Sequence, residues 1–150
     1  MFPQPDQDCP NLVLPPCVVV HGLADMRLAL SASRPITLLS APGAAIFAGA
    51  GWWRALMILA KQDHTIEFCD VLDCADSPGQ AMAAIRAGQR RLVLDPACPA
   101  FARVAAIGAL VLPERPPALD LAHRGAPRQL DAWLARPSAP SGADDDSRGR

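Results

Sequence analysis

The sequence predicts an α/β protein with a single doubly wound, mainly parallel sheet of about five strands and helices on both faces. Two observations predict this fold class. Short apolar runs rich in β-branched residues recur along the chain, at residues 17–20, 36–39, 66–72, 92–94 and 110–112. Each of the first four runs is followed by a small or polar loop and an alanine-rich helical pattern, the alternation that strand–helix–strand units produce. The strand order is expected to be flavodoxin-like or Rossmann-like, by analogy alone.

The first two strands are each expected to lead into a helix. The first helix is predicted over about 23–33, because Pro35 lacks an N–H and restricts the residue before it. The second strand leads through the turn 40–43 into a long helix that ends near residue 62.

The later helices are marked by their boundaries. Ser77 and Pro78 predict the start of a helix over 78–87, because serine caps a helix N-terminus and proline suits the first helical position. Helices over about 100–109 and 127–135 follow the fourth and fifth strands.

We expect one domain, over residues 17–136. A chain of 150 residues is long enough to bury about two-thirds of its surface on folding. Residues 1–16 are rich in proline and are expected to form an irregular arm. Residues 137–150 lack any large apolar side chain and are expected to be a disordered tail.

The composition excludes several classes of function. The formal net charge is −1 at pH 7 and no basic stripe is present, so nucleic-acid binding is not expected. The first residues carry neither the positive start nor the apolar stretch of a secretory signal, which favours the cytoplasm. Five cysteines, an odd number, fit reduced thiols in that compartment better than a disulfide framework.

The segment 44–60 carries a single charge, at Arg54, so a helix over it is apolar on nearly every face and must be covered on both sides. Trp52 and Trp53 point about 100° apart on such a helix. We therefore expect a homodimer or another protein partner to contact one of these tryptophans. A membrane-associated subunit is the alternative, but Pro42-Gly43 interrupts the uncharged stretch and disfavours a membrane span.

Polar residues follow the predicted strands at the sheet edge where open α/β sheets bind their ligands. His21 follows the first strand, and Asp73 and Asp95 follow the third and fourth. A small enzyme could use His21 as acid or base, with Asp73 or Asp95 as its polar partner. The other interpretation is that strand ends are polar because they terminate at the surface.

The turn 40–43 is a second candidate site. Ser40 and Gly43 precede a helix, where free backbone N–H groups can hold an anion. No GxGxxG pattern or Walker loop is present, so a tight strand-to-helix turn is the simpler interpretation.

No cofactor or metal is expected. Cys69 and Cys74 do not have the spacing of a structural zinc site. Asp70 and Asp73 point to opposite faces of a strand, so they cannot readily join Asp76 around a magnesium ion. The carboxylates beside Cys74 also disfavour a reactive thiolate there.

These observations predict a small cytoplasmic module without evident catalytic machinery, which binds a protein partner or a small ligand, as a homodimer in the simplest case. The first alternative is the small enzyme with a strand-end cleft. The second is the membrane-associated subunit, held through the apolar helix 44–60.

Overall fold

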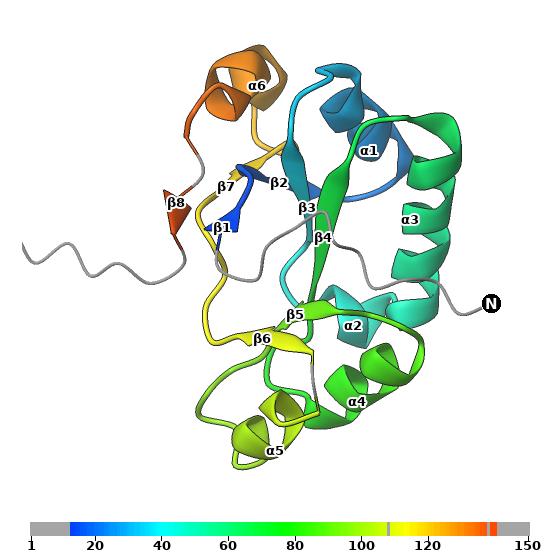
Figure 1. Ribbon diagram of the computed structural model, residues 1–150, viewed down its shortest axis with the longest axis vertical. Coiled ribbons are helices and arrows are strands. Elements are labelled where there is room, and N and C mark those ends of the chain that lie inside the picture. The colour runs from blue at the N-terminus through cyan, green and yellow to red at the C-terminus, as the bar shows by residue number, and fades with distance from the viewer. Residues whose placement is uncertain (1–12, 108, 138, 141–150) are drawn as a thin grey trace, which may run out of the picture.

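The computed structural model describes residues 13–107, 109–137 and 139–140 of the chain (Figure 1). The strands are β1 (Val13–Leu14), β2 (Cys17–Val20), β3 (Ile36–Ser40), β4 (Phe68–Asp73), β5 (Arg91–Val93), β6 (Leu110–Leu112), β7 (Ala118–Asp120) and β8 (Ala139–Pro140). The helices are α1 (Leu23–Ser31), α2 (Ala44–Phe47), α3 (Ala50–Asp63), α4 (Pro78–Arg86), α5 (Phe101–Ala105) and α6 (Ala126–Leu134).

Over these described residues the strands form a six-stranded sheet with the order β6-β5-β4-β3-β2-β7, in which every pairing is parallel. The predicted α/β class and the parallel sheet are therefore confirmed. The order is neither flavodoxin-like nor Rossmann-like, because the chain adds β3 to β6 one after another on the same side of β2. The sequence analysis missed β7, a strand of three residues that lies on the other side of β2.

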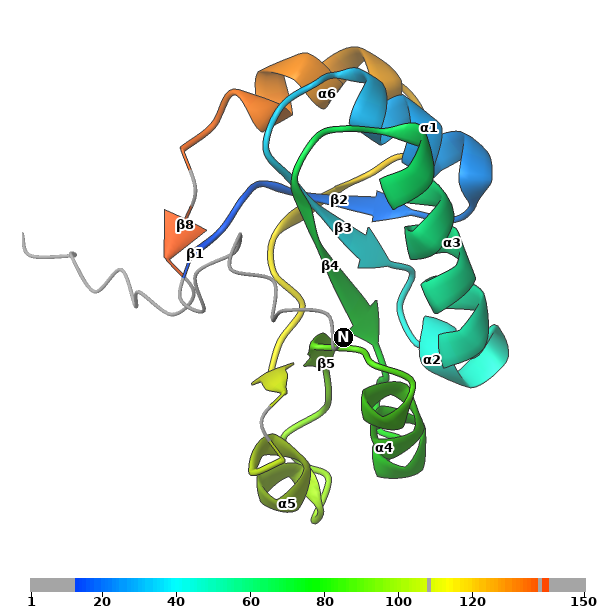
Figure 2. The same ribbon diagram turned by 45° about the vertical axis from the view of Figure 1, so that its right-hand side comes forward.

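The helices are distributed differently from the expectation of two covered faces. Buried residues from all six described helices join one cluster, which packs on the face that Val18, Leu38 and Leu92 share. The cluster on the opposite face draws on strand residues, Leu14 of β1 among them, and on no helix of the described chain. Right-handed crossovers explain this for α1 to α5, which connect β2 to β6, because strands added in one direction place their connecting helices on one side. Figure 2 shows α1, α3 and α6 grouped beside β2, β3 and β4.

The segment 113–117 connects the two edges of the sheet. It leaves β6 at one edge and enters β7 at the other, so it must pass four strands without a helix of its own. Figure 1 shows this yellow segment running along one side of the molecule from β6 to β7. It carries Arg115, which contacts the ends of β3 and β4.

The predicted long helix is broken into α2 and α3, so the expectation of one helix over 44–62 was wrong. Gly49 lies at the break with φ +88° and ψ 156°, a conformation that is essentially restricted to glycine. Of the described helices, none combines the length and the apolar character that crossing a bilayer requires.

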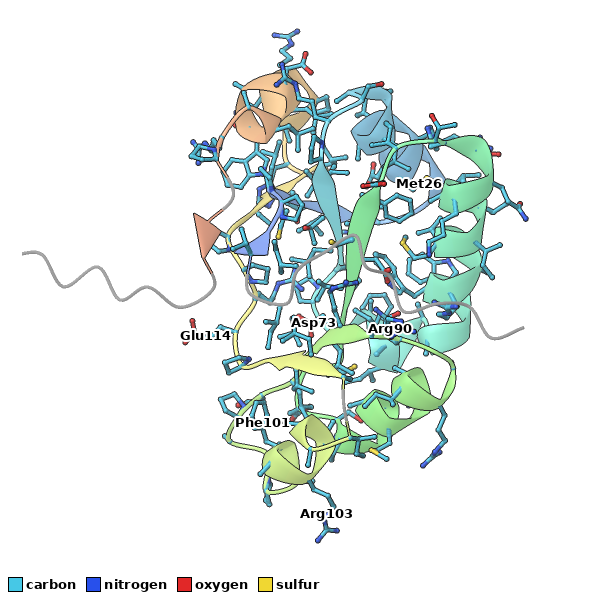
Figure 3. The ribbon with its side chains drawn as sticks, viewed as in Figure 1. Met26, Asp73, Arg90, Phe101, Arg103 and Glu114 are labelled. Carbon is cyan, nitrogen blue, oxygen red and sulfur yellow. The ribbon has the colours of Figure 1, made fainter. Side chains whose placement is uncertain are left out.

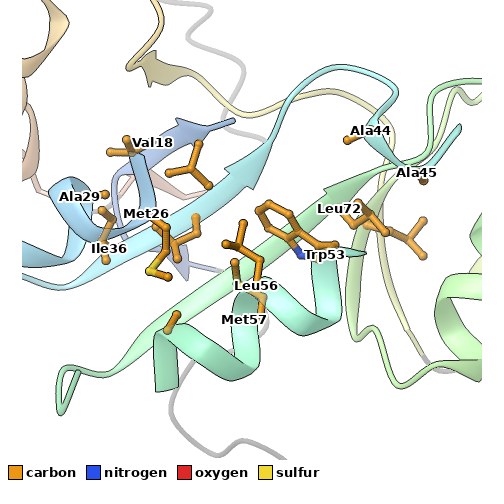
Figure 4. Close-up of a cluster of buried hydrophobic side chains, with 14 of the residues drawn as sticks. Val18, Met26, Ala29, Ile36, Ala44, Ala45, Trp53, Leu56, Met57 and Leu72 are labelled. Atoms are coloured by element: carbon orange, nitrogen blue, oxygen red, sulfur yellow. The ribbon is translucent and has the colours of Figure 1, made fainter. Parts of the chain in front are cut away.

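The main core lies between α3 and the sheet. Figure 4 shows Trp53 among Leu56, Met57 and Leu72, and Trp53 is 0% exposed. Its Nε1–H donates to Asp70 Oδ2 at 2.9 Å, and the side-chain amide of Gln89 donates to the same oxygen at 2.9 Å. The expectation that Trp53 lies at an interface is therefore corrected: its hydrogen bond to a strand carboxylate turns it inward.

The ends of the chain also depart from expectation where they are described. Val13–Leu14 pairs antiparallel with Ala139–Pro140, as β1 with β8, so these parts of the predicted arm and tail are ordered strands. Residues 1–12 of the predicted arm and residues 138 and 141–150 of the predicted tail lie outside the described residues.

Candidate functional site

Asp73, the last residue of β4, is the most constrained polar side chain at the carboxyl edge of the sheet. Its side chain is 4% exposed, and Figure 3 shows it near the middle of the molecule. Its Oδ1 accepts hydrogen bonds from the backbone N–H groups of Gly43 at 3.2 Å and Ala75 at 2.8 Å. Its Oδ2 accepts from Arg115 Nη1 at 2.6 Å. Three donors therefore stabilise one buried carboxylate.

Arg115 completes this cluster from the crossing segment 113–117. Its second nitrogen, Nη2, donates to the backbone oxygen of Ser40 at 3.1 Å. The guanidinium thus bridges the ends of β3 and β4, while its neighbour Glu114 points away from the molecule (Figure 3). We call Asp73, Arg115, Ser40 and Gly43 the Asp73–Arg115 clamp. It holds the crossing segment against the sheet and occupies both carboxylate oxygens of Asp73.

The turn that follows β3 does bind an anion, but that anion is the carboxylate of Asp73. Gly43 has φ +69° and directs its N–H at Asp73. Ser40 is 0% exposed, accepts from the N–H of Asp73 at 2.9 Å and donates to the Ala41 carbonyl at 3.1 Å. The two predicted ligand-binding residues, Ser40 and Gly43, are therefore engaged within the protein.

A second polar cluster joins β2 to β7. His21 Nε2 lies 2.7 Å from Asp120 Oδ1, and Asp120 also accepts from the N–H of Ala122 at 2.9 Å. His123 Nε2 is 3.9 Å from the other Asp120 oxygen. Burial alone would raise the pKa of Asp120, but the hydrogen bonds from Ala122 and His21 outweigh it and lower that pKa below its usual value. The side chain of His21 is 36% exposed, so this pair faces solvent.

The three predicted acid–base residues are separated by the sheet order. His21 pairs with Asp120, Asp73 pairs with Arg115, and Asp95 accepts from the N–H of Ala97 at 2.9 Å in a local turn. Asp95 follows β5, three strands from β2, which corresponds to about 14 Å at the usual strand spacing. No hydrogen bond joins His21 to Asp73 or Asp95 in the described structure.

Sequence reasoning missed Arg115, Asp120 and His123. Arg115 lies between prolines in a loop, where nothing in the local pattern indicates a buried ion pair. Asp120 ends a strand too short to produce a recognisable alternation. A signal was present in Leu119 and Leu121, which flank Asp120 and both pack on the main core.

Among the described cysteines, Cys17, Cys74 and Cys98 are free thiols and Cys69 is disulfide-bonded. Cys69 forms a disulfide bond, so the expectation that all five cysteines are reduced is wrong at this position. Burial raises the pKa of Cys17 to about 11. Burial, and then the charge of Asp73, raise the pKa of Cys74 to about 12, so this thiol is protonated and unreactive at neutral pH. Over the described residues, no three His, Cys, Asp or Glu side chains gather as a metal site requires.

The outward surface of α2 and α3 is apolar. Its exposed large side chains are Ile46 (52%), Phe47 (70%), Trp52 (37%), Ile58 (50%) and Leu59 (40%). Arg54 is the one charged residue from Ala44 to Ala60, and it is half-buried against Gly88. We call these five apolar residues the α2–α3 face. Of the two predicted interface residues, Trp52 belongs to this face and Trp53 lies beneath it.

Comparison with known proteins identifies no relative of this chain. No family model, no curated protein and no solved structure matches the chain.

Proposed function

We propose that this chain is a non-catalytic α/β module that binds a protein partner through the α2–α3 face, and that the partner is a second copy of the chain. The observation that carries the proposal is the exposure of five large apolar side chains on two consecutive helices. Large apolar patches on soluble proteins commonly mark sites of protein interaction.

The energetics favour association at this face. Full burial of a large apolar side chain contributes about 1.5–3 kcal/mol. Phe47 is 70% exposed and Ile58 is 50% exposed, so covering each of them contributes a corresponding part of that free energy. Trp52 packs against the buried ring of Trp53 with centroids 6.0 Å apart, so it loses little freedom when a partner covers it. From Ala44 to Ala60 the one charged residue is Arg54, and it is half-buried. A two-fold dimer brings the same apolar surface from both copies together.

Substitution of aspartate for an apolar residue of the α2–α3 face tests the proposal. We expect the wild-type chain to elute as a dimer in size-exclusion chromatography with light scattering, and Phe47→Asp and Ile58→Asp to elute as monomers. Leu28→Asp is the matched control, because Leu28 is an exposed leucine on α1, outside this face. A wild-type chain that is monomeric at high concentration contradicts self-association, and recovery only in a detergent fraction favours the membrane-associated alternative.

A second candidate function is acid–base catalysis by the His21–Asp120 pair. One observation favours it: Asp120 lies 2.7 Å from His21 Nε2, and the histidine is open to solvent, as a general base held by a carboxylate would be. Asp120 takes the place expected for Asp73 or Asp95. Turnover of ester or phosphoester substrates that His21→Gln abolishes would support this function, and turnover that survives the substitution would exclude this residue as its base.

We propose the cytoplasm as the compartment. Free thiols at Cys17, Cys74 and Cys98 favour a reducing environment, whereas the disulfide at Cys69 opposes it. Alkylation of thiols in intact cells, followed by fractionation and mass spectrometry, shows whether the protein lies in the reducing cytoplasm or in an oxidising compartment. We expect the protein in the cytoplasmic fraction, and recovery outside it would contradict the proposal.

A further inference from the structure

A groove with a volume of about 450 Å³ lies between α4 and α5, and none of its lining residues belongs to the α2–α3 face. Its volume falls within the range of ligand sites, which is about 300–1,000 Å³. Most of its lining is apolar, and Met82, Val104 and Ile107 are its large apolar side chains. The complete lining is Pro78, Gly79, Met82, Arg86, Ala100, Arg103, Val104 and Ile107.

Two arginines give this groove a positive charge. Arg86 ends α4 and Arg103 lies in α5, both are exposed, and no acidic residue joins the lining. Within the described part of the chain neither guanidinium makes an ion pair or a hydrogen bond. Figure 3 shows Arg103 extending from α5 away from the body of the molecule. The groove thus combines a mostly apolar lining with two uncompensated cations.

We infer that this groove binds a peptide segment of a second protein, which inserts a large apolar side chain between α4 and α5 and places carboxylates against Arg86 and Arg103. The charge complementarity selects an acidic segment, and the apolar lining selects one with a hydrophobic anchor. A groove between two helices is a common receptor for such segments.

The chain's own acidic residues do not meet both requirements. Asp144–Asp146 could face the arginines, but residues 137–150 contain no large apolar side chain to fill the groove. Nucleic acid does not fit either, because the groove offers two cations and apolar contacts and the chain as a whole has a net charge of −1. An acidic, apolar segment from another protein satisfies both parts of the groove.

Selection of random peptides displayed on phage, with the full-length chain as bait, tests this inference. We expect the enriched peptides to carry acidic residues around a large apolar one. Their affinity should fall about tenfold or more for Arg86→Glu and for Arg103→Glu, because each reversal replaces an attraction by a repulsion. Ile107→Asp should weaken binding as well. Arg128→Glu is the matched control, since Arg128 is an exposed arginine on α6, away from the groove.

Three outcomes overturn the inference. The first is that selection enriches no peptide, and the second is that the enriched peptides bind Arg86→Glu and Arg103→Glu as tightly as the wild type. The third is that the chain sediments with phosphatidylglycerol vesicles through Arg86 and Arg103 and binds no peptide, which assigns the groove to a membrane surface. Peptides that lose affinity on Phe47→Asp and not on Arg86→Glu would support the α2–α3 face instead, so the two proposals fail separately.

Discussion

Replacing Arg115 by alanine removes the residue that fastens the crossing segment 113–117 to the sheet. The substitution deletes the hydrogen bond to Asp73 Oδ2 at 2.6 Å and the one to the Ser40 carbonyl at 3.1 Å. Asp73 then remains as a carboxylate with a side chain 4% exposed, held by the N–H groups of Gly43 and Ala75 alone. The crossing segment loses its link to the ends of β3 and β4.

The magnitude follows from burial. Removing one partner of a fully buried ion pair costs about 3–5 kcal/mol, because the other charge is left uncompensated. The side chain of Arg115 is 27% exposed, so water can reach part of the vacated space and lower that cost. We therefore expect the free energy of unfolding to fall by about 2–3 kcal/mol, which lowers the melting temperature by about 4–12 °C in a chain of this size.

Urea denaturation followed by tryptophan fluorescence and circular dichroism measures the loss. Arg128→Ala, at an exposed arginine, is the control and should change the free energy of unfolding by less than about 0.5 kcal/mol. The double variant Arg115→Ala with Asp73→Asn should be more stable than the sum of the two single losses predicts, by about 1–2 kcal/mol. A single loss below about 0.5 kcal/mol, or strictly additive losses, would refute the clamp.

Three further predictions concern the helix break, the Asp120 cluster and the thiols. Gly49→Ala should destabilise the fold by about 1–3 kcal/mol, because alanine does not tolerate φ +88°. Gly51 lies in α3 with nothing within 4 Å of an added Cβ, so Gly51→Ala should stabilise the fold by about 0.5–1 kcal/mol. Thermal melts of both variants measure the two effects. The pKa of Asp120 is lowered in the folded protein, so its contribution to stability is complete above the unfolded pKa of 3.8 and is lost as the pH falls through the folded pKa. Asp120→Asn should therefore flatten the acid limb of the curve of stability against pH. An unchanged acid limb would contradict this prediction. In the native protein an aromatic disulfide reagent at neutral pH should label the half-buried Cys98 before Cys17 or Cys74, because burial raises the pKa of Cys17 to about 11 and that of Cys74 to about 12. Cys98→Ser should remove one equivalent of fast-reacting thiol, and fast labelling of Cys74 in the native protein would contradict this prediction.

Local chemistry accounts for most of the elements that the sequence predicted. The strands β2 and β6 coincide with the predicted runs 17–20 and 110–112, because apolar β-branched residues bounded by loop residues fit a buried strand. The helix α4 begins where Ser77 and Pro78 predicted it, and the Ser77 hydroxyl accepts from the N–H of Gln80 at 3.3 Å. These features need no distant partner, so the sequence alone determines them.

The sites depended on contacts that no local pattern contains. Asp73 and Arg115 are 42 residues apart, and His21 and Asp120 are 99 residues apart. Each pair meets because β7 lies beside β2 and the segment 113–117 crosses the sheet to reach it. The same order places Asp95 far from His21, and thus determines which polar residues share a site.

The sequence by itself determined the α/β class, the parallel strands and the apolar character of the segment 44–60, because these follow from side-chain type and short-range periodicity. The tertiary structure alone decided the strand order, the single helix-covered face and the direction in which Trp53 points. The physical reason is that strand order, crossover direction and buried hydrogen bonds such as that from Trp53 to Asp70 arise between segments distant in the chain.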